Sequence, residues 1–173
     1  MPSTYTPIAT TTLTSTENLV TFNSFSGYTD LVIVASVKNT GSSVYVVSWG
    51  GIRFNGDTTA NKYSNTSIVS STAGAGSIST DSSVSNALAC ANVFRTDHDN
   101  FNTTVIHIPN YASTTTYKNA LGTSTGSMRF VFESIGIWKD TAAITSLTLV
   151  SEDSSASRFA IGSTFTLYGI LAA

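Results

Sequence analysis

The chain has 173 residues and a formal net charge of −2, and only 10% of its residues are charged, against about 25% in an average soluble domain. The eight Lys and Arg residues are scattered, which excludes the basic surface that nucleic-acid binding requires, and no apolar run approaches the about 20 residues that span a membrane. Serine and threonine make up roughly a third of the chain, and the 41% hydrophobic content excludes disorder.

The length fits one domain with one core, and no repeat or linker is visible, so we expect residues 1–173 to form a single domain. The opening letters MPSTYTPIAT have neither the charged nor the apolar segment of an export signal, and we expect none. A single cysteine, Cys90, excludes an internal disulfide. It lies in the apolar segment 87–91 without a sign of an activating base, so we expect a buried, inert thiol.

In chain order, the sequence predicts strands and almost no helix, because apolar residues alternate with a period of two. One face carries Leu31, Ile33, Ala35 and Val37 in residues 31–37, and Phe159, Ile161, Phe165 and Leu167 in residues 159–167. The expected strands are residues 5–13, 18–24, 31–38, 44–54, 63–70, 84–95, 102–108, 116–121, 127–138, 143–151 and 159–171.

Turn signals separate these strands, at Ser26-Gly27, Asn39-Thr40-Gly41, Asn55-Gly56, Pro109-Asn110, Gly122 and Asp153-Ser154. Many short strands without helices predict an all-β, single-domain antiparallel β-sandwich. Because the strands are numerous and the chain is long, they favour a jelly roll over a seven-stranded immunoglobulin sandwich.

Residues 70–83, SSTAGAGSISTDSS, are the one low-complexity segment. Small polar residues of this kind are typical of a flexible loop at the rim of a sandwich, which is the interpretation we favour. The alternative is an arm that becomes ordered against a neighbouring subunit, because small residues let two backbones pack closely.

Residues 53–64, RFNGDTTANKYS, combine turn residues with an aromatic side chain. Asn55-Gly56 predicts a type I′ turn, because both residues tolerate a positive φ. Asp57 and Asn61 can accept hydrogen bonds from backbone amides of the turn. A calcium site would need more oxygen ligands than these two side chains, so we interpret the segment as a corner between strands.

The best metal-like cluster is Asp97, His98 and Asp99. On a strand His98 would face away from both carboxylates, so the three could converge only in a loop. The second histidine, His107, lies on an expected strand with Ile106 and Ile108 on the opposite face. Two histidines without the characteristic spacing of zinc ligands are weak evidence for a zinc site. We favour a solvated loop for residues 97–99 and expect no metal or cofactor.

No sequence pattern supports catalysis: there is no nucleophile elbow, no phosphate-binding loop, and no carboxylate pair that the sequence places together. We therefore expect no enzyme and assign no catalytic residue. Trp49 and Trp138 are candidates for a sugar-stacking platform. Alternation places Trp138 opposite Ile135 and Ile137, and packing in the core or an interface is the interpretation we favour for both tryptophans.

Four segments resemble a group of small all-β virion proteins of tailed bacteriophages, common among phages of aquatic bacteria. They are RFNGDTTANKYS (53–64), VIHIPNYASTTTYKNALG (105–122), ESIGIWKDTAAITSLTLVS (133–151) and FAIGSTFTLYGI (159–170). The likeness covers most of residues 31–171, and the segments occur in the same order. Lys62 departs from the pattern as an insertion before Tyr63 and Ser64.

The resemblance implies a jelly roll, a homotrimer and a place on the virion, and it brings no catalytic residues. We expect a capsid decoration (cement) protein that binds the major capsid protein on the capsid surface. The alternative is a receptor-binding module of a tail fibre or tail tip that binds glycan. Few charges suit close packing against other proteins, and contacts between subunits would protect edge strands that carry few charges or prolines.

Overall fold

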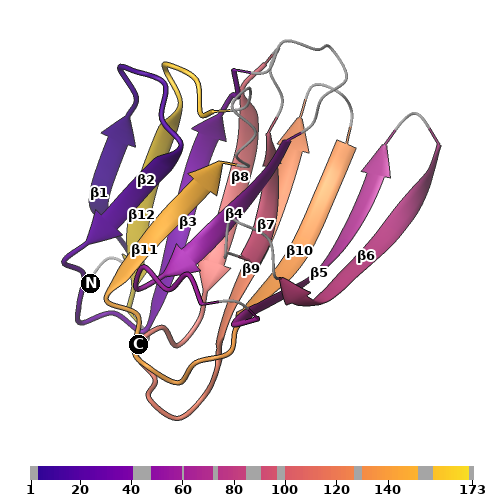
Figure 1. The fold of residues 1–173 in the computed structure, drawn as a ribbon. Helices are drawn as coiled ribbons and strands as arrows, with labels where there is room; N and C mark the ends of the chain where they lie inside the picture. The colour runs from indigo at the N-terminus through magenta and orange to yellow at the C-terminus, as the bar shows by residue number, and fades with distance from the viewer. Residues whose placement is uncertain are drawn as a thin grey trace.

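The computed structural model describes residues 4–40, 48–59, 61–71, 74–84, 91–96, 100–126, 130–151 and 158–171. Twelve strands and no helix occur in these residues (Figure 1). They are β1 (Tyr5–Thr12), β2 (Leu19–Asn23), β3 (Asp30–Val37), β4 (Ser48–Phe54), β5 (Tyr63–Ser71), β6 (Gly74–Val84), β7 (Ala91–Thr96), β8 (Asn102–Ile108), β9 (Lys118–Gly126), β10 (Phe130–Trp138), β11 (Ser146–Ser151) and β12 (Thr164–Ile170).

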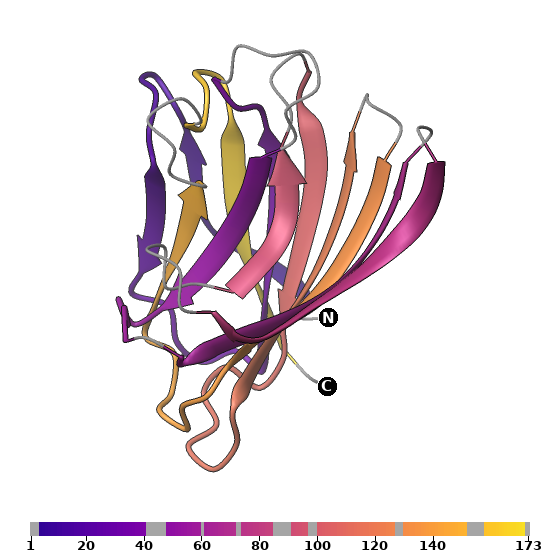
Figure 2. The ribbon, with the colours of Figure 1, turned by 45° about the vertical axis from the view of Figure 1, so that its right-hand side comes forward.

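The strands form two sheets, one of eight strands in the order β1-β12-β3-β8-β9-β10-β5-β6 and one of four in the order β2-β11-β4-β7. Every pairing between these strands is antiparallel. The predicted all-β antiparallel sandwich is therefore confirmed. The small sheet covers only part of the large one, so that β5 and β6 project beyond it (Figure 2).

The core lies between the sheets, and the alternation of β3 shows why it forms there. The predicted inner face of β3, with Leu31, Ile33, Ala35 and Val37, is at most 4% exposed. At the C-terminal end, Phe159, Phe165 and Leu167 are buried as predicted, but Ile161 is 61% exposed. Ile161 lies in the turn before β12, where Gly162 has a φ of 85°, so strand alternation does not extend through it.

The loop predicted for residues 70–83 is wrong, because most of this segment forms β6 and pairs with β5. Ile78 lies opposite Ile68, and Thr80 lies opposite Thr66. Serine and threonine tolerate an extended backbone, and pairing with a neighbouring strand satisfies backbone groups that the composition alone assigns to a loop.

The turn predicted at Gly122 is also wrong. Gly122 lies inside β9, opposite Ser134 of β10, and the β9–β10 connection comes later, after Gly126. The other expected strands coincide with observed ones. Of the expected strand 84–95, the described part from residue 91 onward lies in β7, whereas Val84 ends β6 and residues 85–90 lie outside the described ranges. Turns at Gly27 and Asn110 are confirmed by φ values of 82° and 48°, whereas the one at Asp153-Ser154 lies outside the described residues.

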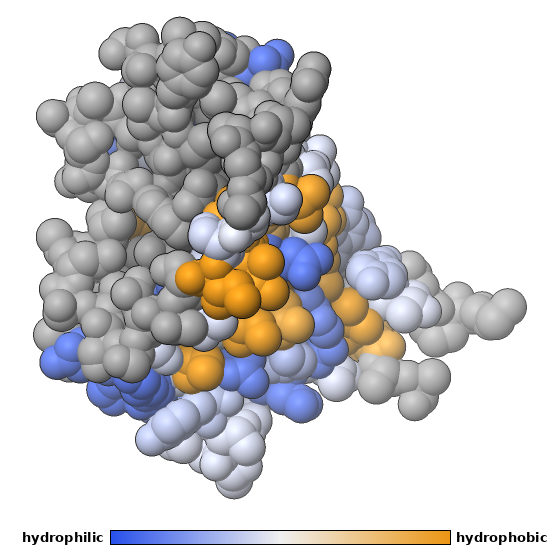
Figure 3. Space-filling view, turned by 90° about the vertical axis from the view of Figure 1, so that its right-hand side faces the viewer, coloured by the Kyte–Doolittle hydropathy of each residue, from blue (hydrophilic) through white to orange (hydrophobic). Residues whose placement is uncertain are grey.

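The outer face of the large sheet, which points away from the small sheet, carries exposed aliphatic side chains. Between 40% and 73% of each is exposed: Val34, Ile68, Ile78, Val105, Leu121, Val131 and Ile135. They come from six neighbouring strands of this sheet, and cross-strand register places several side by side, such as Val34 with Val105 and Leu121 with Ile135. The view from the β5–β6 side shows hydrophobic side chains gathered on this part of the molecule (Figure 3).

Candidate functional site

The segment RFNGDTTANKYS forms the corner where the chain leaves β4 in the small sheet and enters β5 in the large sheet. Asn55 and Gly56 have φ values of 52° and 66°, and the backbone N–H of Asp57 donates to the carbonyl of Phe54 over 2.9 Å. Positive φ at both central residues is what a type I′ turn requires. The predicted turn is confirmed, but it joins strands of different sheets and therefore does not close a hairpin.

The side chain of Asn55 ties this turn to the segment before β11. Its amide nitrogen donates to the carbonyl of Ala143 over 2.9 Å. Its amide oxygen accepts hydrogen bonds from the backbone N–H groups of Thr145, over 2.8 Å, and Ser146, over 3.2 Å. One side chain therefore fixes a segment about 90 residues away in sequence.

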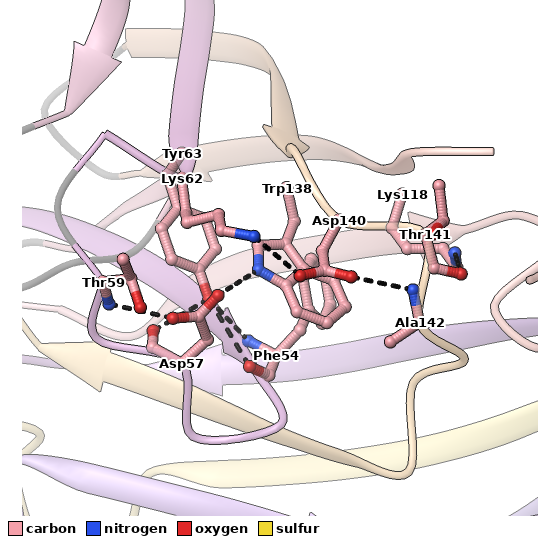
Figure 4. A network of polar contacts seen from close by, with 10 residues as sticks. All are labelled: Phe54, Asp57, Thr59, Lys62, Tyr63, Lys118, Trp138, Asp140, Thr141 and Ala142. Atoms are coloured by element: carbon pink, nitrogen blue, oxygen red, sulfur yellow. Dashed lines mark hydrogen bonds and ion pairs between the residues drawn. The ribbon is translucent and has the colours of Figure 1, made fainter.

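Asp57 holds the other side of the corner (Figure 4). Its Oδ1 accepts from the backbone N–H of Thr59 over 2.8 Å, and its Oδ2 accepts from the indole Nε1–H of Trp138 over 2.7 Å. The predicted bond from Asp57 to a backbone amide is confirmed. Burial by itself raises the pKa of Asp57, but the hydrogen bonds from Thr59 and Trp138 outweigh it and leave this pKa below its ordinary value.

Trp138 lies in the core. Only 2% of it is exposed, and its ring centroid lies 5.8 Å from that of Phe54. The predicted packing role is confirmed for Trp138, and a sugar cannot stack on a ring at this position. For Trp49 the side chain lies outside the described part of the structure.

Tyr63, the first residue of β5, contacts the turn through its hydroxyl group. Its ring is fully buried, and its hydroxyl oxygen accepts from the backbone N–H of Phe54 over 3.1 Å. The same hydroxyl group donates to the carbonyl of Asp57, with 3.1 Å between the two oxygens. Asn61, the other predicted turn residue, has a φ of 66° and accepts a bond from Lys139 Nζ through its carbonyl over 3.4 Å.

Lys62, the residue that departs from the virion-protein pattern, forms an ion pair. Its Nζ lies 2.8 Å from Oδ2 of Asp140, and both side chains are about one-third exposed. Oδ1 of Asp140 accepts from the backbone N–H of Ala142 over 2.9 Å. The Lys62–Asp140 hydrogen bond raises the pKa of Lys62 and lowers that of Asp140.

Lys118 is a buried lysine that the sequence analysis did not single out. It is 1% exposed, and its Nζ donates to the carbonyls of Thr116, over 2.8 Å, and Thr141, over 3.1 Å. Burial lowers the pKa of Lys118, and the charge of Asp140 opposes this shift. The one available signal was its place two residues before the buried Ala120 on a strand, which puts both on the inner face.

These contacts make the corner a structural joint. All four carboxylate oxygens of Asp57 and Asp140 accept hydrogen bonds from the protein itself. The arrangement fixes the positions of β4, β5, β10 and the segment before β11 relative to one another.

His107 lies on β8 with Ile106 and Ile108 buried on the opposite face, as predicted. Its Nε2 lies 2.9 Å from Oδ2 of Asp30, whose Oδ1 accepts from the backbone N–H of Asn110. This pair joins β8 to β3 and to the turn after β8.

The other metal candidates, Asp97, His98 and Asp99, lie outside the described residues, as does Cys90. Within the described ranges, no group of three or more His, Cys, Asp or Glu side chains is close enough to hold a metal ion. No helix long and apolar enough to cross a membrane occurs there either.

Comparison with protein-family models, with curated proteins and with solved structures finds no match for this chain.

Proposed function

We propose that this chain is a structural protein of a phage particle, and that it binds another virion protein through the outer face of its large sheet. The observation that carries the proposal is the row of exposed aliphatic side chains on this face. On β10 the outer face holds Val131 and Ile135, each about half exposed. In a sheet that faces water on one side, the apolar residues belong on the inner face.

The aliphatic side chains of this face are candidates for a protein interface. Seven aliphatic side chains on one face of one sheet form a surface that soluble monomers rarely leave exposed, although single exposed aliphatic residues are common. Covering a half-exposed aliphatic side chain contributes about half of the roughly 1.5 to 3 kcal/mol gained by full burial. The binding free energy from a partner that covers most of the seven side chains is several times this amount.

The strand order supports the jelly-roll assignment. Four pairs are nested in the chain, β1 with β12, β2 with β11, β3 with β8 and β4 with β7. The first and third belong to the large sheet, and the second and fourth belong to the small one. A long hairpin wound around a core gives this order of eight strands, and the hairpins β5–β6 and β9–β10 are then insertions that widen the large sheet.

Within the virion, the role we propose is capsid decoration by a homotrimer. The place on the virion and the homotrimer are what the sequence resemblance implies. Three copies of one face, each with modest affinity, would attach together far more firmly than one. The open edge strand β6 has one charged residue, Asp81, and no proline, which favours a neighbour that covers it. The opposite edge strand, β1, has a proline at an irregularity in its pairing.

Quantification of the protein in purified particles tests the proposed place. A copy number close to that of the major capsid protein, and density on the capsid surface in electron cryomicroscopy, are the expected results. A copy number close to that of a tail fibre would overturn capsid decoration in favour of the receptor-binding alternative. Specific binding on a glycan array would support the same alternative, although Trp138 cannot form its stacking surface.

Substitutions on the outer face test the proposed surface itself. Ile135→Ser should weaken attachment to undecorated capsids, because it removes an aliphatic group from the centre of the face. Ile161→Ser is the matched control, since Ile161 is also an exposed isoleucine but lies in the turn before β12. Equal attachment by both variants would refute binding through this face.

A further inference from the structure

The outer face of the large sheet contains a pocket of about 310 Å³ over β5, β9 and β10. Six outward-pointing side chains line it: Thr66, Ile68, Leu121, Thr123, Glu133 and Ile135. Gly122 and Ser134, which lie between these residues on β9 and β10, complete the lining. The volume is that of a small site rather than of a large ligand cleft.

Glu133 is the charged residue of this lining. Cross-strand register places it between Ile68 on β5 and Thr123 on β9. On its own strand, the next outward-pointing residues are Val131 and Ile135. In the described part of the chain, its carboxylate has no ion pair and no hydrogen bond. A carboxylate with free acceptor sites therefore stands among aliphatic side chains at the centre of the face.

A carboxylate at the centre of an apolar interface is unfavourable unless the partner neutralises it, because association removes its water. The group that fits has a cation at its end and methylene groups behind it. Arginine meets both requirements. Its planar guanidinium can donate two parallel hydrogen bonds to one carboxylate, and its methylene groups can lie along Leu121 and Ile135.

We propose that this pocket binds an arginine side chain presented by the partner protein, with the guanidinium on Glu133 and the aliphatic stem against Leu121 and Ile135. This inference rests on the proposed function, since it names the residue by which the partner is recognised. Arginine is enriched among the residues that dominate binding energy at interfaces. The pocket gives a role to the Glu133 carboxylate, which lies among aliphatic side chains of this face.

The test is a nuclear magnetic resonance titration of the 15N-labelled protein with Nα-acetylarginine N-methylamide. Nα-acetylcitrulline N-methylamide is the matched probe, because citrulline has nearly the same shape without the positive charge. The expected result is millimolar binding of the arginine probe, with amide shifts confined to the surroundings of Leu121, Glu133 and Ile135. Binding of the citrulline probe should be about tenfold weaker.

Two variants distinguish arginine binding at Glu133 of the pocket from arginine binding at any exposed carboxylate. Glu133→Gln should weaken arginine binding about tenfold and remove its preference over citrulline. Glu17→Gln should leave both unchanged, since Glu17 is an exposed carboxylate outside the pocket that accepts a bond from Ser15. Both variants alter exposed side chains, and their amide spectra report whether they fold.

Equal affinity for the two probes, shifts dispersed over the surface, an unchanged Glu133→Gln variant or the absence of binding would each overturn the inference. The titration uses no virion. If the arginine probe does not bind, capsid decoration is not contradicted. If the copy number indicates a tail location, the measured binding of arginine in the pocket is not contradicted.

Discussion

Replacing Asp57 by alanine tests whether hydrogen bonds hold the corner between the sheets. The substitution removes the acceptor of the Trp138 indole N–H, which is buried with its ring, and the acceptor of the Thr59 N–H. A buried donor left without a partner costs about 1 to 3 kcal/mol, and the turn contact adds to this loss. We expect unfolding free energy to fall by about 2 to 4 kcal/mol, which lowers Tm by roughly 5 to 15 °C in a chain of this size.

Urea unfolding followed by near-ultraviolet circular dichroism measures this change, and a double-mutant cycle assigns it. Trp138→Phe keeps an aromatic ring against Phe54 but has no N–H to satisfy. In that background Asp57→Ala should cost about 1 to 2 kcal/mol less than in the native chain. Asp140→Ala is a control, and its loss should be smaller than that of Asp57→Ala because water reaches the Lys62–Asp140 pair. Additive losses within about 0.5 kcal/mol would refute the Asp57–Trp138 contact as the cause.

Three further outcomes follow from the same structure. The native pKa of Asp57 lies below its ordinary value of 3.8, so the carboxylate contributes its full stabilisation of the fold above that pH and loses it as pH falls through the native pKa. The unfolding free energy that Asp57→Asn loses, measured with urea, should therefore be smaller at acidic than at neutral pH. A loss that does not change with pH would contradict this prediction. Gly169→Ala should prevent stable folding because the added Cβ would overlap the Tyr28 ring. Combining it with Tyr28→Ala should restore part of the lost Tm, and no restoration would contradict the overlap as the cause. Asn55→Gly keeps the permissive φ but loses the bonds to the segment before β11, so it should lose about 1 to 3 kcal/mol in thermal unfolding, and Asn55→Ala should lose more because it also strains the backbone.

The elements of the core could be predicted because local pattern and tertiary structure agree there. In β3 the residues that alternate as apolar are also the ones that face the small sheet. Asn55-Gly56 likewise specifies its turn through two adjacent residues. By contrast, β6 looks like a loop in sequence, and only its pairing with β5, with Ile78 opposite Ile68, makes it a strand.

The contacts of the candidate site could not be predicted from the sequence, apart from the turn itself. Asp57 and Trp138 are 81 residues apart, and Lys62 and Asp140 are 78 residues apart. Alternation correctly placed Trp138 on the opposite face from Ile135 and Ile137. It does not predict that the indole N–H of Trp138 donates to Asp57, which lies in the corner between β4 and β5. Such pairs depend on strand order, which the sequence pattern leaves open.

Strand β10 shows why the outer surface required the structure. Both of its faces carry large hydrophobic residues, so alternation alone does not say which face is inside. Phe132 and Trp138 take the inner face and are nearly fully buried, which forces Val131 and Ile135 outward together with Glu133. An aliphatic outer face is therefore the consequence of packing two large aromatic rings inward. Neighbouring outer positions carry Thr66 and Thr123, so this face accepts hydroxyl side chains as well. A partner on the outer face accounts for aliphatic side chains at Val131 and Ile135 instead.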